Sequence, residues 1–138
     1  MAVANDELKA RYLRDKVMTA TPAQRVVMLY DRLGLDLNLA ESTQDAGARG
    51  EYLSHAMSIV IELRASLDLA VGGPADNLAS LYAYMISRII EIRGGASDKL
   101  PAVREIVTEL RSAWAQAAEL TSTAATSPAP SGASAWVG

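Results

Sequence analysis

Residues 22–44 contain more apolar positions than one face of a helix can hold. The apolar residues recur every three to four positions, which predicts a long helix, and Thr21, Pro22 and Gln24 suit its start as capping residue, first helical residue and capping-box partner. The expected core face is an arc about 100° wide that contains Val26, Leu29, Tyr30, Leu33, Leu37 and Ala40. A second, narrower stripe lies about 150° away and consists of Met28, Leu35 and Leu39. Because one core cannot cover both, the second stripe needs another helix of this chain, a second copy, or a different partner.

The same helical period predicts three further long helices. They are expected over residues 51–71, over residues 75–93, and from about residue 100 to residue 120, with Gly-containing breaks at 46–50, 72–74 and 94–95. Beside the main apolar faces of the first two of these helices lie four additional apolar side chains: Met57, Ile61, Tyr84 and Ile90. A shorter and thinly apolar helix, loosely docked, is expected over residues 5–17, which include Tyr12 and Val17.

These elements predict an all-α fold: an antiparallel four-helix bundle with a short extra N-terminal helix and a disordered C-terminal tail. The bundle domain is expected over residues 1–120. Residues 121–138 are mostly Ser, Thr, Ala, Pro and Gly, with no charge and no helical period, so they are expected to form the tail. Trp136 within it is interpreted as a chance tryptophan rather than a recognition residue.

Composition and charge exclude several classes of partner. The net charge is −3, with acidic and basic residues intermixed, which gives no electrostatic footprint for nucleic acid or for an anionic membrane. Cysteine is absent, so the sequence offers no disulfide and no thiolate. The first residues do not resemble a signal peptide, and no apolar run approaches the length of about eighteen residues that suggests a membrane span. We therefore expect a soluble cytoplasmic protein without membrane insertion.

The search for catalytic chemistry finds no convincing site. His55 is the single histidine, and Tyr52 stands where a Glu-x-x-His metal motif would need glutamate, so His55 is expected to be a solvated surface residue. The glycine pairs at 72–73 and 94–95 lack the preceding strand or the Lys-Ser/Thr of a phosphate-binding loop. We expect no enzymatic activity, no metal and no cofactor.

A series of short segments occurs in one order along residues 12–118. The series begins with Tyr12, Val-Met-Thr-Ala-Thr-Pro at 17–22 and Val-Met-Leu-Tyr-Asp at 27–31. It continues with Ile-Val-Ile-Glu-Leu at 59–63 and Asn-Leu-Ala-Ser-Leu-Tyr-Ala-Tyr-Met-Ile-Ser-Arg at 77–88, and it ends near Trp114. Each segment is a weak signal alone, but the ordered set resembles the FliS family of flagellar secretion chaperones.

The resemblance implies a small cytoplasmic helical bundle that binds the C-terminal segment of newly made flagellin. Such a protein keeps that segment from polymerising and presents it to the flagellar type III export gate. The resemblance also implies that the bound segment wraps around the bundle in apolar grooves, and that the part of the chain holding Tyr12 can lie over a groove in the free protein. The expected partner-binding residues are Tyr12, Val17, Met28, Arg32, Leu35, Leu39, Met57, Ile61, Tyr84 and Ile90.

Arg32 departs from the family pattern, which usually has glycine after Leu-Tyr-Asp. It projects beside Met28 and Leu39, so its stem is able to cover the second stripe while its head stays in water. It either narrows the groove or pairs with an acidic residue of the partner, and Gly34 is the alternative position for a close approach. Two other functions stay open: a structural module that self-associates through the second stripe, and a regulatory adaptor for another flagellar protein, such as an anti-sigma factor.

Overall fold

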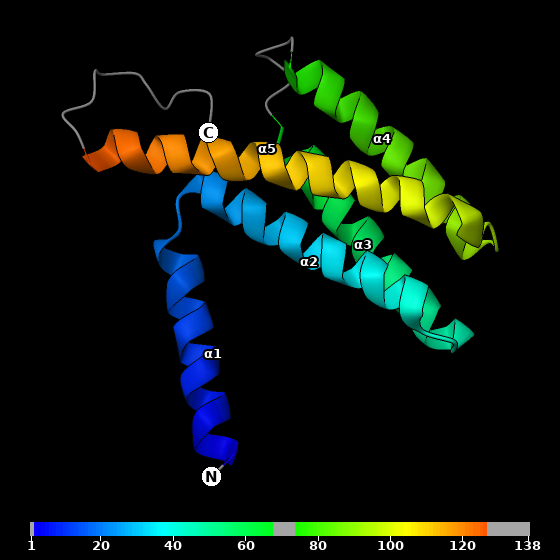
Figure 1. Ribbon diagram of the computed structural model, residues 1–138, viewed down its shortest axis with the longest axis horizontal. Coiled ribbons are helices and arrows are strands. Elements are labelled where there is room, and N and C mark those ends of the chain that lie inside the picture. Colours follow the sequence, from blue (N-terminus) through cyan, green and yellow to red (C-terminus); the bar gives the residue numbers. More distant parts are fainter. Residues whose placement is uncertain (1, 68–73, 127–138) are drawn as a thin grey trace.

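The computed structural model of the protein describes residues 2–67 and 74–126. Within these residues the chain forms five α-helices, one short 3₁₀-helix and no strand, which confirms the predicted all-α class (Figure 1). The elements in chain order are α1 (Ala2–Thr19), α2 (Pro22–Ser42), α3 (Ala46–Ala65), α4 (Pro74–Arg93), η2 (Ser97–Lys99) and α5 (Leu100–Thr126).

Helices α2 to α5 form the predicted antiparallel bundle. Helix α2 packs against both α3 and α5, and α3 packs against α4, while α4 and α5 contact each other less than these three neighbouring pairs do. Figure 1 shows that α4 and α5 meet near the η2 turn and diverge toward the other end of the bundle. The same view shows α1 projecting away from the four bundled helices.

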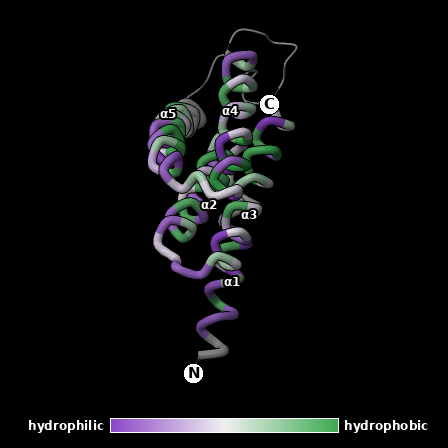
Figure 2. The backbone as a smooth tube through the Cα atoms, turned by 90° about the vertical axis from the view of Figure 1, so that its right-hand side faces the viewer, coloured by the Kyte–Doolittle hydropathy of each residue, from purple (hydrophilic) through white to green (hydrophobic). Residues whose placement is uncertain are grey.

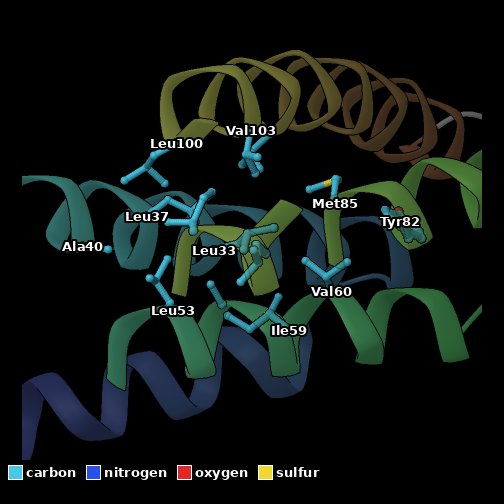
Figure 3. Packing of buried hydrophobic residues seen from close by; sticks show 14 of the residues in the cluster. Leu33, Leu37, Ala40, Leu53, Ile59, Val60, Tyr82, Met85, Leu100 and Val103 are labelled. Atoms are coloured by element: carbon cyan, nitrogen blue, oxygen red, sulfur yellow. The ribbon is translucent and has the colours of Figure 1, made fainter. Parts of the chain in front are cut away.

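The core of the bundle contains the apolar face expected for the first long helix. Leu33 and Leu37 of α2 point toward Met85 of α4 and Val103 of α5, with Leu53 and Val60 of α3 beside them (Figure 3). The buried part of the α2 face consists of Tyr30, Leu33, Leu37 and Ala40, while Val26 and Leu29 are partly buried and pack against the same cluster. The mixture of Leu, Ile, Val, Ala and Met allows close packing of helix on helix.

Helix α3 differs from the expectation at both ends. It begins at Ala46, so residues 46–50 form its first turns rather than a break. The cause is Asp45, whose carboxylate accepts a hydrogen bond of 2.9 Å from the backbone N–H of Ala48 and so caps the helix start. The helix ends at Ala65 rather than near residue 71, and residues 68–73 lie outside the described residues.

The two terminal helices are longer than expected. Helix α1 covers Ala2–Thr19, and α5 continues to Thr126, six residues beyond the expected end of the last helix. The sequence between residues 120 and 127 contains neither Gly nor Pro, and therefore nothing in it forces the helix to stop. Residues 127–138, with Trp136, lie outside the described residues. Among the described helices, none is long and apolar enough to cross a membrane.

Candidate partner-binding surface

Four large apolar side chains stay about half exposed on the bundle. They are Leu35 of α2, Ile61 of α3, and Tyr84 and Ile90 of α4, with exposed fractions from 45% to 54%. Leu33, two residues before Leu35, has no exposed surface, so the two apolar stripes of α2 have separate environments. Met28 and Leu39, the other members of the second stripe, are half-buried.

Met57, Ile61 and Ile90 border one seam, between α3 and α4. Gly50 of α3 and Arg93 of α4 line the same cavity between these helices, which identifies the sides that face each other. On α3, Met57 lies seven residues after Gly50 and Ile61 lies eleven residues after it. These spacings place all three residues on one side of the helix, within an arc of about 40°. On α4, Ile90 precedes Arg93 by three residues, an offset of about 60°. Met57 also packs against the buried cluster, so it belongs partly to the core.

Tyr84 lies on the other flank of α4. Six residues separate it from Ile90, which places the two side chains about 120° apart on the helix. The guanidinium of Arg88 lies 5.0 Å from the centre of the Tyr84 ring, and Arg88 pairs with Glu91, which also binds Lys99 of η2 (Nζ–Oε2 distance 2.6 Å). The hydrogen bond from Lys99 holds the pKa of the Glu91 carboxyl below its ordinary value. This flank therefore faces the connection to α5, and the predicted residues do not form a single patch.

Helix α1 leaves its own apolar side chains uncovered. Tyr12 is 65% exposed, and Leu8 and Leu13 are exposed beside it. Most of α1 is hydrophilic and stands clear of the bundle (Figure 2). Tyr12 therefore does not lie over a groove in this structure. The side chain of Val17 lies outside the described residues.

The connection between α1 and α2 is short and well defined. Ala20 is buried, and Thr21 and Gln24 form the predicted capping box, with hydrogen bonds of 3.1 Å and 2.9 Å between each side chain and the backbone N–H of the other residue. A capping box fixes the direction in which the chain enters a helix.

A buried charge that the sequence reading missed lies beside the second stripe. Asp36 of α2 is fully buried; its Oδ2 is hydrogen-bonded to Nδ1 of His55 from α3, and its Oδ1 lies 3.4 Å from Nε of Arg32. His55 is half exposed, as expected, but it has a specific hydrogen-bond partner. One feature of the sequence indicates that Asp36 is buried. It lies three residues after Leu33 and four before Ala40, which places it on the edge of the core face.

A second polar group in the core is formed by tyrosines. The hydroxyl oxygens of Tyr30 (α2) and Tyr82 (α4) are 2.5 Å apart, and the indole of Trp114 from α5 acts to lower the pKa of both hydroxyls. Burial raises the pKa of both hydroxyls above the ordinary value for tyrosine. The group joins three helices, and its two hydroxyl-bearing side chains are buried, so its arrangement is that of a structural contact.

The seam between α2 and α5 is polar on its outer side. Arg111 pairs with Asp31 (Nε–Oδ1 distance 2.8 Å), and Arg104 pairs with Glu41. The Arg104–Glu41 pair lies away from the second stripe, whereas Asp31 precedes Leu35 by four residues and so borders the stripe on the side of α5. Among the described residues, no group of three or more His, Cys, Asp or Glu side chains could hold a metal ion.

Comparisons with known proteins agree with this architecture. A family model described as flagellar protein FliS matches residues 4–121. The chain is similar to a protein of Salmonella typhimurium named flagellar secretion chaperone FliS, with 36% identity over 107 residues that cover 72% of this chain and 78% of the relative. Proteins of the same name are similar in Bacillus subtilis, with 30% identity over 110 residues (77% of this chain, 82% of the relative), and in Vibrio cholerae, with 39% identity over 70 residues (49% and 52%). The chain belongs to the FliS family of flagellar proteins.

Proposed function

We propose that this protein is a cytoplasmic flagellar export chaperone. It binds the C-terminal segment of flagellin, prevents its premature polymerisation and assists its delivery to the export gate of the flagellar type III apparatus. Membership of the FliS family supports this function, since the relatives in three bacteria are named secretion chaperones. The observation that carries the proposal for this chain is the set of half-exposed apolar side chains on α2, α3 and α4. No enzymatic step belongs to the proposal.

The distribution of these side chains suits an unfolded partner better than a folded one. A folded protein docks on one contiguous face, whereas Leu35, Ile90 and Tyr84 lie on separate faces of the bundle. An unfolded segment reaches all of them by wrapping, with apolar residues at helical spacing inserted between the bundle's helices. Ordering such a segment costs several kcal/mol, so a wide interface is needed to leave useful affinity.

We assign the contacts to the residues expected from the sequence. The second stripe of α2 (Met28, Leu35, Leu39), the α3–α4 seam and Tyr84 supply apolar contacts, and Arg32 supplies a polar one. Tyr12 and Val17 of α1 contact the partner or cover part of the same surface when the partner is absent. Binding then prevents polymerisation, because the flagellin face that would contact another flagellin is already covered by this protein.

The test compares the two apolar stripes of α2. The double change Leu35→Asp with Leu39→Asp should leave the helix content and the melting temperature nearly unchanged, but abolish binding of the flagellin C-terminal segment in a calorimetric titration. Leu33→Asp should instead unfold the bundle, because it buries an unpaired charge at a cost of at least about 4 kcal/mol. Unfolding of both variants would contradict the assignment.

The rival proposals predict different results in the same samples. A structural module would show a dilution-dependent mass in light scattering and no heat on addition of the flagellin segment. An adaptor would bind another flagellar protein, for example an anti-sigma factor, through the same grooves, and the Leu35→Asp with Leu39→Asp variant would lose that binding.

A further inference from the structure

Arg32 is the one cation among the predicted binding residues, and one edge of its guanidinium is held in place. Its Nε lies 3.4 Å from Oδ1 of Asp36, and its side chain is 53% exposed. Asp36 cannot move away, because it is fully buried and its second oxygen, Oδ2, is hydrogen-bonded to His55 of the neighbouring helix. The Arg32 side chain is therefore partly positioned before any partner arrives.

The other edge of the guanidinium is open. Among the described residues, no hydrogen bond engages Nη1 or Nη2 of Arg32, and its one ion pair is with Asp36, which it approaches through Nε. The pairing with Asp36 is also incomplete, because Oδ1 accepts no hydrogen bond of good geometry. Arg32 thus carries two forked donors that remain available in water.

The position of Arg32 makes this open edge relevant to binding. It lies four residues after Met28, three before Leu35 and seven before Leu39, so it borders the second stripe of α2. A partner segment that covers the stripe also covers the guanidinium and removes it from water. Removing a charged group from water is costly unless a hydrogen-bonding group of opposite charge replaces the water.

We propose that Arg32 is a specificity-determining residue that binds a carboxylate of the partner segment, an Asp or Glu beside its apolar face. A carboxylate matches the two parallel donors of the guanidinium, whereas the backbone carbonyls of a helical segment are already used within the helix. Asp36 and His55 act as positioning residues that hold the guanidinium at the stripe. This inference rests on the proposed function and adds to it the chemistry of one contact.

The test measures the binding of the flagellin C-terminal segment by calorimetry to the intact chain and to three variants. Arg32→Gln should raise the Kd about tenfold, the usual effect of losing one charge-assisted, bidentate pair. Arg32→Lys should restore only part of the affinity, because an ammonium group lacks the fork. Arg104→Gln is the matched control, since Arg104 also pairs with a carboxylate of α2, that of Glu41, but on the polar α2–α5 seam away from the second stripe, and it should change the Kd by less than about twofold.

A double-mutant cycle separates a direct contact from an effect on folding. Each acidic residue of the segment is changed to its amide in turn. With one of these altered segments, Arg32→Gln should no longer change the Kd appreciably. Unchanged affinity of Arg32→Gln, or equal losses with every amide variant, overturns the carboxylate contact while leaving the chaperone proposal in place. Failure of the unmodified chain to bind the segment at all overturns both.

Discussion

At the scale of single residues, the most unusual feature is a carboxylate without access to water. A buried carboxylate is costly unless it is paired and hydrogen-bonded. Asp36 meets this requirement in part, because Oδ2 is hydrogen-bonded to His55 and Oδ1 lies near Arg32 without a hydrogen bond; both partners keep about half of their side chains in solvent. Their exposure limits the cost of the cluster, because only the carboxylate loses most of its hydration.

We predict that His55→Ala destabilises the protein although His55 is exposed. The change removes the hydrogen bond to Oδ2 and leaves the buried carboxylate with Arg32 alone, so the free energy of unfolding should fall by about 1–3 kcal/mol. Chemical denaturation measures this difference. Glu62→Ala, at an exposed position two turns further along α3, is the control and should change stability by less than about 0.5 kcal/mol. Equal stability of the two variants would contradict the role of His55.

The buried tyrosine pair predicts a specific loss of stability in alkali. Burial raises the pKa of Tyr30 and Tyr82 in the folded protein above the ordinary value of 10.0. Above this pH the unfolded chain loses its phenolic protons while the folded protein keeps them, so the free energy of unfolding falls as the pH rises. Denaturation at a series of pH values from about 9 to 12 should show a smaller fall for the Tyr30→Phe, Tyr82→Phe double variant than for the unmodified chain. Parallel curves would contradict the burial of ionisable hydroxyls.

The sequence indicated the polarity of these residues but not their pairing. His55 was correctly expected at the surface, whereas its bond to Asp36 depends on the register between α2 and α3, which no periodicity within one helix contains. The same holds for Tyr30 and Tyr82, which both fall on predicted core faces. Contacts between residues distant in the sequence become definite only when the helices are placed against one another.

At the scale of elements, α2 is the helix that contributes both to the core of the bundle and to its exposed apolar surface. Its core stripe packs against α3, α4 and α5, and its second stripe holds Leu35 about half exposed. Gly34 lies inside this helix on the side of α5: a Cβ atom placed there would lie 3.9 Å from Cγ1 of Val107, an ordinary contact distance. The close approach that Gly34 was expected to supply therefore does not concern the second stripe.

We predict that Gly34→Ala stabilises the protein. Alanine fits the space and loses less backbone freedom on folding, so the free energy of unfolding should rise by about 0.5–1 kcal/mol. Gly95→Ala is the matched control with the opposite sign, because Gly95 has a φ of 118°, where a side chain is strained. Thermal unfolding of both variants checks the prediction, and a loss of stability in Gly34→Ala would contradict it.

The helices themselves were largely predictable, and their ends were not. Strong apolar periodicity located all four bundle helices and, for α2, the face that it buries. The start of α3 was misplaced because the two glycines at 47 and 50 suggested a break, while the capping carboxylate of Asp45 decided the outcome. A capping hydrogen bond of this kind influences where a helix begins or ends as strongly as the helix propensity of the residues there.

At the scale of the whole molecule, the bundle combines a closed core with apolar positions on several faces. The α2–α5 seam is covered by ion pairs, whereas the second stripe, the α3–α4 seam and Tyr84 remain accessible. The individual surface residues were predictable because each falls outside its helix's core arc. Their division among separate faces was not, since it depends on how the helices pack.

The position of α1 predicts that it contributes little to the stability of the bundle. No described residue of α1 belongs to the buried cluster, and the helix stands clear of the other four (Figure 1). A chain that starts at Ala20 retains the buried connection and the capping box, so its free energy of unfolding should differ from that of the full chain by less than about 1 kcal/mol. Denaturation of both chains, followed by circular dichroism, tests this. A larger loss would show that α1 packs on the bundle in solution.

The central claim, that the exposed apolar residues receive the flagellin C-terminal segment, is tested most directly by amide hydrogen exchange with and without a saturating amount of that segment. The account predicts slower exchange in α2 near Leu35, in α3 near Ile61 and in α4 between Tyr84 and Ile90, with little change along the outer α2–α5 seam. Unchanged exchange in these three stretches despite saturation, or protection confined to α5, would contradict it.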